Sequence, residues 1–224
     1  MEAVRKNEYE KVVHFLARQR GCINLQEPDT GLTALHVAAG DGNLPTVKLL
    51  LTHRASANLT DRQGDSPLHY ACYKGHTPVI RLLVNTGAEI NNENKRGFTP
   101  IFLSSWKGFL EATRLLLDVG AKVDGKRTAK STPLLAACKA GHYDVVSLLL
   151  ERKAWVDARP GTNNEITPLH VTAQAGHRDL IAVARLVCWF KMGLTCTKKM
   201  HSVQRRWKPP FNADFIHSLN LFTR

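Results

Sequence analysis

No stretch of the sequence is apolar over a length that could cross a membrane. The longest apolar stretch, residues 181–190, is interrupted by Arg185 and closed by Lys191, whereas a membrane-spanning helix needs about 20 consecutive apolar residues. Residues 1–11 are charged and contain no apolar core of the signal-peptide kind. We therefore expect neither a membrane span nor secretion, and we predict a cytoplasmic location, with the nucleus as a second compartment.

Cysteine is sparse, and its spacing argues against cross-linking by disulfides or metal. The 5 cysteines are odd in number and include no CxxC pair, a pattern that excludes both a regular disulfide framework and a common zinc site. A reducing compartment fits this pattern. The cysteines are Cys22, Cys72, Cys138, Cys188 and Cys196.

Acidic residues are also scarce. The 19 Asp and Glu residues are outnumbered by 31 Lys and Arg residues, which gives a formal net charge of +12. From Arg185 onward the chain is strongly basic and contains a single acid, Asp214. A basic surface attracts acidic partners, so we expect acidic protein segments to bind, with nucleic acid as the less favoured alternative.

What the sequence does contain is an internal repeat. A short motif of the Thr-Pro-Leu-His type recurs at successive offsets of 33, 33, 33 and 35 residues, a glycine follows it at the same offsets, and an apolar triplet follows in four copies. The motifs begin at Gly31, Gly64, Gly97, Lys130 and Glu165; the glycines are Gly42, Gly75, Gly108, Gly141 and Gly176; the triplets are 49–51, 82–84, 115–117 and 148–150.

Each landmark has a physical reason to recur. A hydroxyl residue such as Thr99 caps a first helix, and a proline such as Pro100 fits its first turn, where no N–H is needed. The glycine suits the left-handed turn that ends a short helix, and the triplet gives a second helix its buried stripe. The sequence therefore predicts units of helix, turn, helix and extended hairpin, which are stable only when they stack on their neighbours.

This repeat resembles that of the ankyrin family, whose units carry a Thr-Pro-Leu-His motif. The resemblance covers about residues 29 to 184 and implies an all-α repeat solenoid, an ankyrin repeat stack of helix-turn-helix units joined by β-hairpin loops. It also implies that the motif histidines His36, His69 and His170 are structural and bridge adjacent loops through hydrogen bonds.

We divide the chain into seven parts on this register. The first part reads as a truncated capping repeat, and the last has no repeat at all. A divergent or alternatively spliced end accounts for that tail, and a docking tail is the alternative. The parts are the capping repeat at 1–28, ankyrin repeats at 29–60, 61–93, 94–126 and 127–159, a divergent last repeat at 160–190, and a basic tail at 191–224.

No arrangement of residues is typical of catalysis or of cofactor or metal binding. Residues 120–126 match the start of a phosphate-binding loop, but Arg127 stands where that loop needs Ser or Thr. The motif histidines recur once per repeat, so sequential ones lie a full layer apart, too far to share one zinc ion at about 2 Å. Cys72 and Cys138 stand where other copies have alanine, a small buried position. We therefore predict a protein that is not an enzyme and has no cofactor.

One modification pattern is present. Leu83 followed by Glu89, Ile90 and Asn91 is similar to the pattern by which many ankyrin repeats resemble substrates of an asparaginyl hydroxylase. The resemblance makes Asn91 a candidate hydroxylation site. The alternative is an asparagine that only pins its hairpin loop.

The resemblance also indicates where a partner binds. Ankyrin proteins bind through the concave side, made of the hairpin tips and the exposed face of the first helices. Trp106 stands where other copies carry Gly40, Tyr73, Lys139 or Gln174, so we expect it to be an exposed anchor, with nearby cations setting the register. The alternative is that the charged tips are simply solvated. The predicted partner-binding residues are Arg62, Tyr70, Tyr73, Lys74, Lys95, Arg96, Trp106, Lys107, Lys126, Arg127 and Lys139.

Together these features predict a monomeric, non-catalytic protein–protein interaction module. We expect an intracellular adaptor or scaffold in signalling that binds an acidic or phosphorylated partner segment on its concave face. One alternative is a nuclear regulator that binds transcription or chromatin factors, supported only by the basic tail. Another is a fragment of a larger ankyrin-containing protein.

Overall fold

The computed structural model describes residues 2–6, 10, 12–14, 22–125, 131–155, 172 and 175. All of these lie in the first of the two units into which the chain divides, residues 1–185. The predictions that concern Lys126, Arg127, most of the last repeat and the basic tail therefore fall outside the described residues.

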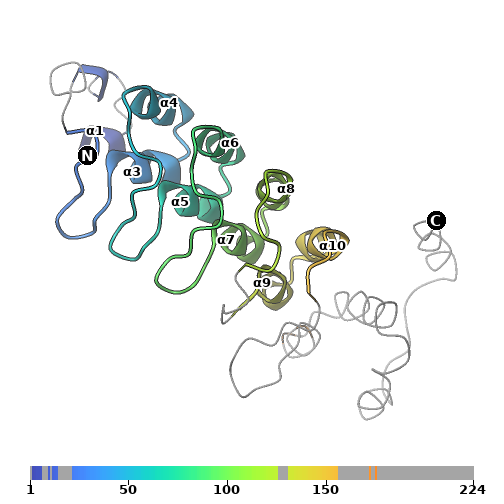
Figure 1. Ribbon diagram of the computed structural model, residues 1–224. Helices are drawn as coiled ribbons and strands as arrows, with labels where there is room; N and C mark the ends of the chain where they lie inside the picture. The colour runs from blue at the N-terminus through green and yellow to red at the C-terminus, as the bar shows by residue number, and fades with distance from the viewer. Residues whose placement is uncertain are drawn as a thin grey trace, which may run out of the picture. The chain divides into compact units, whose positions relative to one another are not determined.

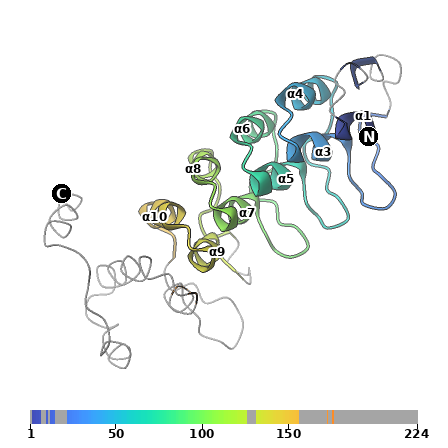
Figure 2. The same cartoon turned by 180° about the vertical axis from the view of Figure 1, so that it is seen from behind.

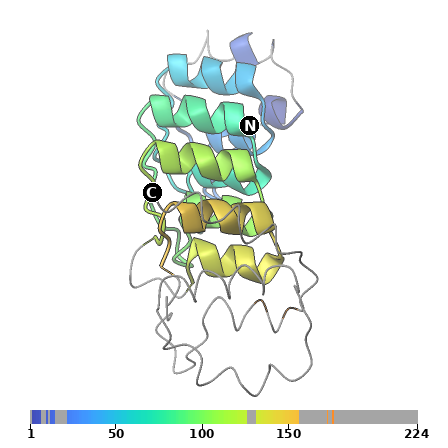
Figure 3. The same cartoon turned by 90° about the vertical axis from the view of Figure 1, so that its right-hand side faces the viewer.

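Helices come in antiparallel pairs that stack side by side, and the described residues contain no strand. Figures 1 and 2 show two rows: the first helices of the pairs form one row, and the second helices form the other. Figure 3 shows the pairs one above the next. This is the predicted repeat solenoid. The helices are α1 (Glu2–Arg5), then α3 (Ala34–Gly40) with α4 (Leu44–Thr52), α5 (Pro67–Lys74) with α6 (Thr77–Asn85), α7 (Pro100–Lys107) with α8 (Leu110–Asp118), and α9 (Pro133–Ala140) with α10 (Tyr143–Glu151).

The first helices begin at the predicted hydroxyl residues. Thr99 Oγ1 accepts a hydrogen bond from the Phe102 N–H at 3.3 Å, and Thr132 Oγ1 accepts one from the Leu135 N–H at 3.2 Å. A proline follows each of these caps and occupies the first turn. Local chemistry therefore fixes where each first helix starts.

Three of the predicted glycines, Gly75, Gly108 and Gly141, end first helices in the left-handed conformation. Gly75 closes α5 with φ at 78°, a region that residues with a Cβ rarely adopt. A Cβ at this position would also lie 2.6 Å from the ring of Phe109 in the next repeat. Conformation and space therefore both require glycine here.

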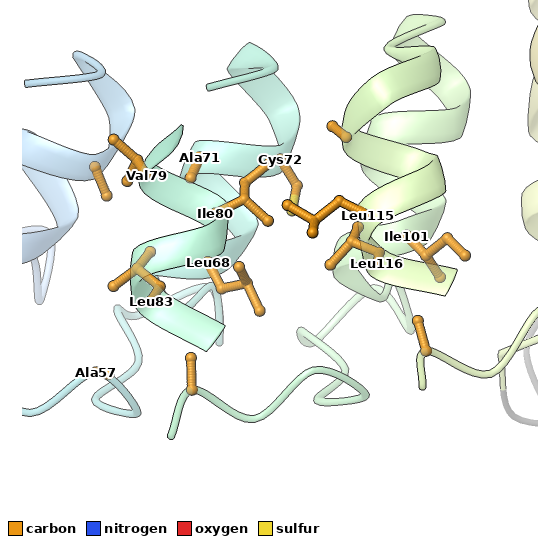
Figure 4. Close-up of a cluster of buried hydrophobic side chains, with 14 of the residues drawn as sticks. Ala57, Leu68, Ala71, Cys72, Val79, Ile80, Leu83, Ile101, Leu115 and Leu116 are labelled. Atoms are coloured by element: carbon orange, nitrogen blue, oxygen red, sulfur yellow. The ribbon is translucent and has the colours of Figure 1, made fainter. Parts of the chain in front are cut away.

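The core lies between the two rows of helices and is built from the second-helix triplets and the first-helix interiors. Leu83 and Leu116, the central residues of two triplets, are fully buried (0% exposed). Figure 4 shows Leu83 beside Leu68 of α5, and Leu116 beside Ile101 of α7. Packing of this kind joins each helix pair internally and to its neighbours.

Cys72 and Cys138 belong to this core, as the sequence predicts. Burial raises the pKa of the Cys138 thiol to about 12 and raises the pKa of the Cys72 thiol well above its usual range. Because the thiolate is the reactive form, burial favours the unreactive thiol at both positions.

The repeat that contains α7 and α8 lacks two histidine bridges that the preceding repeat has. His69 Nε2 lies 3.1 Å from the Phe98 carbonyl oxygen, and His76 Nε2 lies 3.1 Å from the Gly40 carbonyl oxygen. Phe102 and Phe109 occupy the corresponding positions one repeat later, and neither can donate such a bond. Apolar contacts must replace these bridges.

A small second apolar cluster provides part of that replacement. The rings of Phe98 and Phe102 stack with their centroids 4.2 Å apart and their planes at 10°. Leu103 of α7 and Ala136 of α9 complete the cluster. It joins these two first helices on the hairpin side.

The same repeat buries an unsatisfied hydroxyl, and its removal is expected to stabilise the protein. Ser105 is fully buried and its Oγ has no hydrogen-bond partner; other copies have Ala39, Cys72 or Cys138 here. Because a buried unpaired polar group is destabilising, Ser105→Ala should raise the free energy of unfolding by about 1 kcal/mol in urea denaturation.

Ser104→Ala is the matched control for this prediction. Ser104 is equally buried, but its Oγ donates to the Ile101 carbonyl oxygen at 3.1 Å and accepts from Thr113 Oγ1 at 3.0 Å. This substitution should lower the free energy of unfolding by about 1 kcal/mol. Equal effects of the two substitutions would show that the unpaired state of Ser105 is energetically irrelevant.

Candidate protein-binding surface

The first helices α5, α7 and α9 expose side chains near their C-terminal ends. On α5 the buried residues include Leu68, Ala71 and Cys72, whereas Tyr73 and Lys74 at the end of the helix are exposed. Figure 1 shows the second helices in a row along one side of the first helices. The exposed side chains of the first helices and those of the hairpin tips together form what we call the first-helix face.

An aromatic and cationic cluster lies at the centre of this face. Tyr73 of α5 and Trp106 of α7 are 37% and 39% exposed, and their ring centroids are 6.2 Å apart. Lys107 Nζ lies 4.4 Å from the Tyr73 ring centroid and 5.0 Å from that of Trp106. The structure therefore brings together three predicted binding residues from two successive repeats.

The backbone under Trp106 is held by the next repeat. His142 Nε2 lies 3.1 Å from the Trp106 carbonyl oxygen, and the left-handed Gly108 ends α7 two residues later. A Cβ on Gly108 would lie 2.5 Å from the His142 ring, so the two residues fit closely. The backbone that carries Trp106 is therefore held in place by the next repeat.

Several cations of the face have no carboxylate partner among the described residues. Lys74 at the end of α5 is exposed, as are Lys95 and Arg96 at a hairpin tip, and the ion pairs found in the described part of the chain involve other residues. Lys139 on α9 is exposed as well, but it already makes an interaction within the chain and is not one of these cations. The face therefore carries positive charge that the protein's own described residues leave uncompensated.

Two predicted binding residues are instead tied into the scaffold. The Tyr70 hydroxyl donates to Asp61 Oδ2 at 2.8 Å, and its ring meets that of His36 edge to face. Arg62 Nη2 donates to the Pro28 carbonyl oxygen of the neighbouring hairpin. Both residues stabilise the hairpins, although Arg62 is exposed, and partner binding by either residue stays a prediction.

Comparison with protein families agrees with this architecture. A family model described as ankyrin repeats (3 copies) matches residues 1–94, 41–127, 78–160 and 102–187. The chain belongs to the ankyrin repeat family. Ankyrin repeats are protein–protein interaction modules. A comparison with the curated proteins gives no match. None of the described helices combines the length and apolar character of a membrane span.

The motif histidines of these ankyrin repeats are structural, as the resemblance implies. The Ser66 N–H donates to His69 Nδ1 at 3.1 Å, while His69 Nε2 reaches the next hairpin. His36 repeats this arrangement with Thr33 and Asp65. Each imidazole ring therefore makes hydrogen bonds both within its own repeat and to the next repeat. His170 lies outside the described residues.

Asn91 also has a structural part in the ankyrin stack. Its Oδ1 accepts from the Lys122 N–H at 2.8 Å and its Nδ2 donates to the Gly120 carbonyl oxygen at 3.5 Å, which pins the next loop. Asn58 makes the same pair of bonds to Glu89 and Gly87 one repeat earlier. The geometry matches the loop-pinning alternative, and hydroxylation of Asn91 stays a prediction.

The sequence analysis does not predict that the Lys107 ammonium lies over the rings of Tyr73 and Trp106. Tyr73 and Trp106 share one repeat position, and Lys74 and Lys107 share the next. Stacked repeats bring equal positions close together. That register is the signal from which the cluster could have been predicted.

Proposed function

We propose that the protein is an adaptor or scaffold that binds an acidic or phosphorylated segment of a partner protein on the first-helix face. The observation that carries this proposal is the set of uncompensated cations, Lys74, Lys95, Arg96 and Lys107, beside the exposed rings of Tyr73 and Trp106. The adaptor acts as a monomer in the cytoplasm.

The two kinds of side chain have different tasks. Exposed aromatic side chains supply large apolar contact areas and are frequent binding hot spots. Cations around them steer an acidic segment toward the face and set its register. Because the hairpin cations and the helix cations lie on one face, an extended acidic segment can contact both.

Charge reversal on the face tests this proposal. Lys74→Glu with Lys95→Glu should weaken the capture of partner proteins by at least about tenfold, because like charges oppose the acidic segment. Quantitative affinity purification from cells is the measurement, with folding checked by circular dichroism. Partners that are lost should carry acidic or phosphorylated segments.

The matched control is Lys48→Glu with Arg81→Glu. Both residues are exposed on second helices, α4 and α6, and the change in net charge is the same. This control should retain the partners. If the Lys74 and Lys95 variant also retains all of them, binding takes place on another surface and the proposal is wrong.

A further inference from the structure

The cluster of Tyr73, Trp106 and Lys107 combines a charge with the apolar surface that the charge covers. The Lys107 ammonium lies within 5.0 Å of both ring centroids, and the two rings are tilted at 55° to each other. Trp106 is 39% exposed. A partner that reaches these rings therefore meets the ammonium as well.

The rings attract this ammonium without neutralising it. An aromatic ring interacts with a cation through its quadrupole and has no net charge of its own. No carboxylate pairs with Lys107 in the part of the chain that the structure describes. An incoming carboxylate can therefore form a charge-assisted hydrogen bond, which is stronger than a bond between neutral groups.

We propose that this cluster recognises a two-part feature of the partner: an Asp or Glu side chain directly beside an apolar side chain. The carboxylate binds Lys107 Nζ and draws it away from the rings, and the apolar side chain then packs on the uncovered faces of Tyr73 and Trp106. Lys107 is thus the residue that determines specificity. This inference rests on the proposed function and narrows its partner class.

Either half of the feature alone is a poorer ligand. A purely apolar segment must displace the ammonium from the rings and offers no charge in return. An acidic segment without an apolar side chain leaves the uncovered rings in water, and their burial is the main source of affinity at such anchors. The adjacency of the two groups is therefore what the cluster selects.

The repeat on one side of the cluster disfavours an acidic group at the equivalent position. Asp41, the C-cap residue directly after α3, occupies the repeat position that Lys74 and Lys107 occupy on α5 and α7, and Ala140 has this position on α9. Asp41 is exposed, so a carboxylate placed over α3 meets a like charge. This gradient favours one placement of the segment along the stack.

Selection from a random peptide library displayed on phage tests the proposal with a defined probe. The purified full chain is used as wild type, as Lys107→Met, which keeps an apolar stem and removes the charge, and as Lys107→Arg. Lys48→Met on α4 is the matched control. We expect the wild type, Lys107→Arg and Lys48→Met to enrich Asp or Glu next to Phe, Leu, Ile or Trp.

Lys107→Met should keep the apolar preference and lose the acidic one. A labelled peptide of the wild-type consensus should bind this variant about tenfold more weakly in fluorescence anisotropy, the ratio expected for one lost charge-assisted hydrogen bond. The Lys48→Met control should bind it as tightly as the wild type does.

The contrary outcomes separate this inference from the proposed function. If Lys107→Met enriches the same acidic motif as the wild type, Lys107 does not determine specificity, while acidic recognition by the face stands. If the wild type enriches acidic residues with no apolar neighbour, the rings take no part and the two-part feature is wrong. If the wild type shows no acidic preference at all, the two-part feature is wrong, and the proposed function is decided by the charge-reversal experiment alone.

Discussion

Leu83→Ala is expected to lower the free energy of unfolding by about 3 kcal/mol, within the range measured for large-to-small changes in well-packed cores. Leu83 is the central residue of its triplet on α6 and is fully buried. The change removes apolar contacts and leaves a cavity that the flanking helices fill only in part. Urea denaturation followed by the helical circular dichroism signal measures the effect, with the midpoint shifted and the slope unchanged.

Leu25→Ala is the control for this prediction, because the Leu25 side chain is 67% exposed. Its effect should stay within about 0.5 kcal/mol of zero. Each repeat is stabilised by its neighbours, so a defect at Leu83, in the middle of the described stack, weakens the contacts on both sides. A loss below about 1 kcal/mol would mean that the second helices are less tightly packed than the burial of Leu83 indicates.

The starts and ends of the helices could be predicted from the sequence because local chemistry determines them. Thr99 and Pro100 define the start of α7 by a hydrogen bond and a missing N–H, both within a few residues of the chain. Gly108 ends the same helix in a left-handed conformation that other residues disfavour. Periodicity then places equal positions of successive repeats side by side.

The side-chain partners could not be predicted in the same way, because they depend on distances between repeats. Tyr70 is one of the predicted partner-binding residues, yet its hydroxyl bonds to Asp61, nine positions away and on the hairpin. Phe102 reads as a departure from the histidine motif, and only the fold shows that it stacks on Phe98.

In the candidate site, too, the position of the residues could be predicted but their side-chain contacts could not. The sequence register predicts that Tyr73, Trp106 and Lys107 share one face, since all three lie near the ends of first helices. It does not predict that the Lys107 side chain folds back over a ring of the preceding repeat. The position of the Lys107 side chain depends on its rotamer and on the separation of α5 and α7. Neither can be predicted from the repeat pattern of the sequence.

The protein is expected to lose stability as the pH falls below about 6.5, because His36 and His69 are held neutral. Burial lowers the pKa of both imidazoles, although nearby Asp61 and Asp65 act in the opposite direction. The Thr33 N–H donates to His36 Nδ1 at 3.1 Å, so that nitrogen has no room for a proton. His69 is held in the same way by Ser66.

The sign follows from proton binding by the two states. The unfolded chain binds a proton at each histidine near the ordinary pKa of 6.5, whereas the folded chain resists it until a lower pH. Stability is therefore complete above pH 6.5 and falls below it, by up to about 1.4 kcal/mol per pH unit for each histidine. Urea denaturation at intervals from pH 7.5 to 5.5 measures this slope.

His69→Phe should remove one histidine's share of the slope, because the residue that replaces it cannot titrate. Phe102 shows that a phenylalanine fits this position in the next repeat. The control is His53→Gln, since His53 is exposed at the end of α4, and its slope should equal that of the wild type. The slope is a difference between pH values, so it is readable even if His69→Phe lowers stability at every pH. An unchanged slope in His69→Phe would show that the pKa of His69 is not lowered in the folded protein and that its two hydrogen bonds do not hold it neutral.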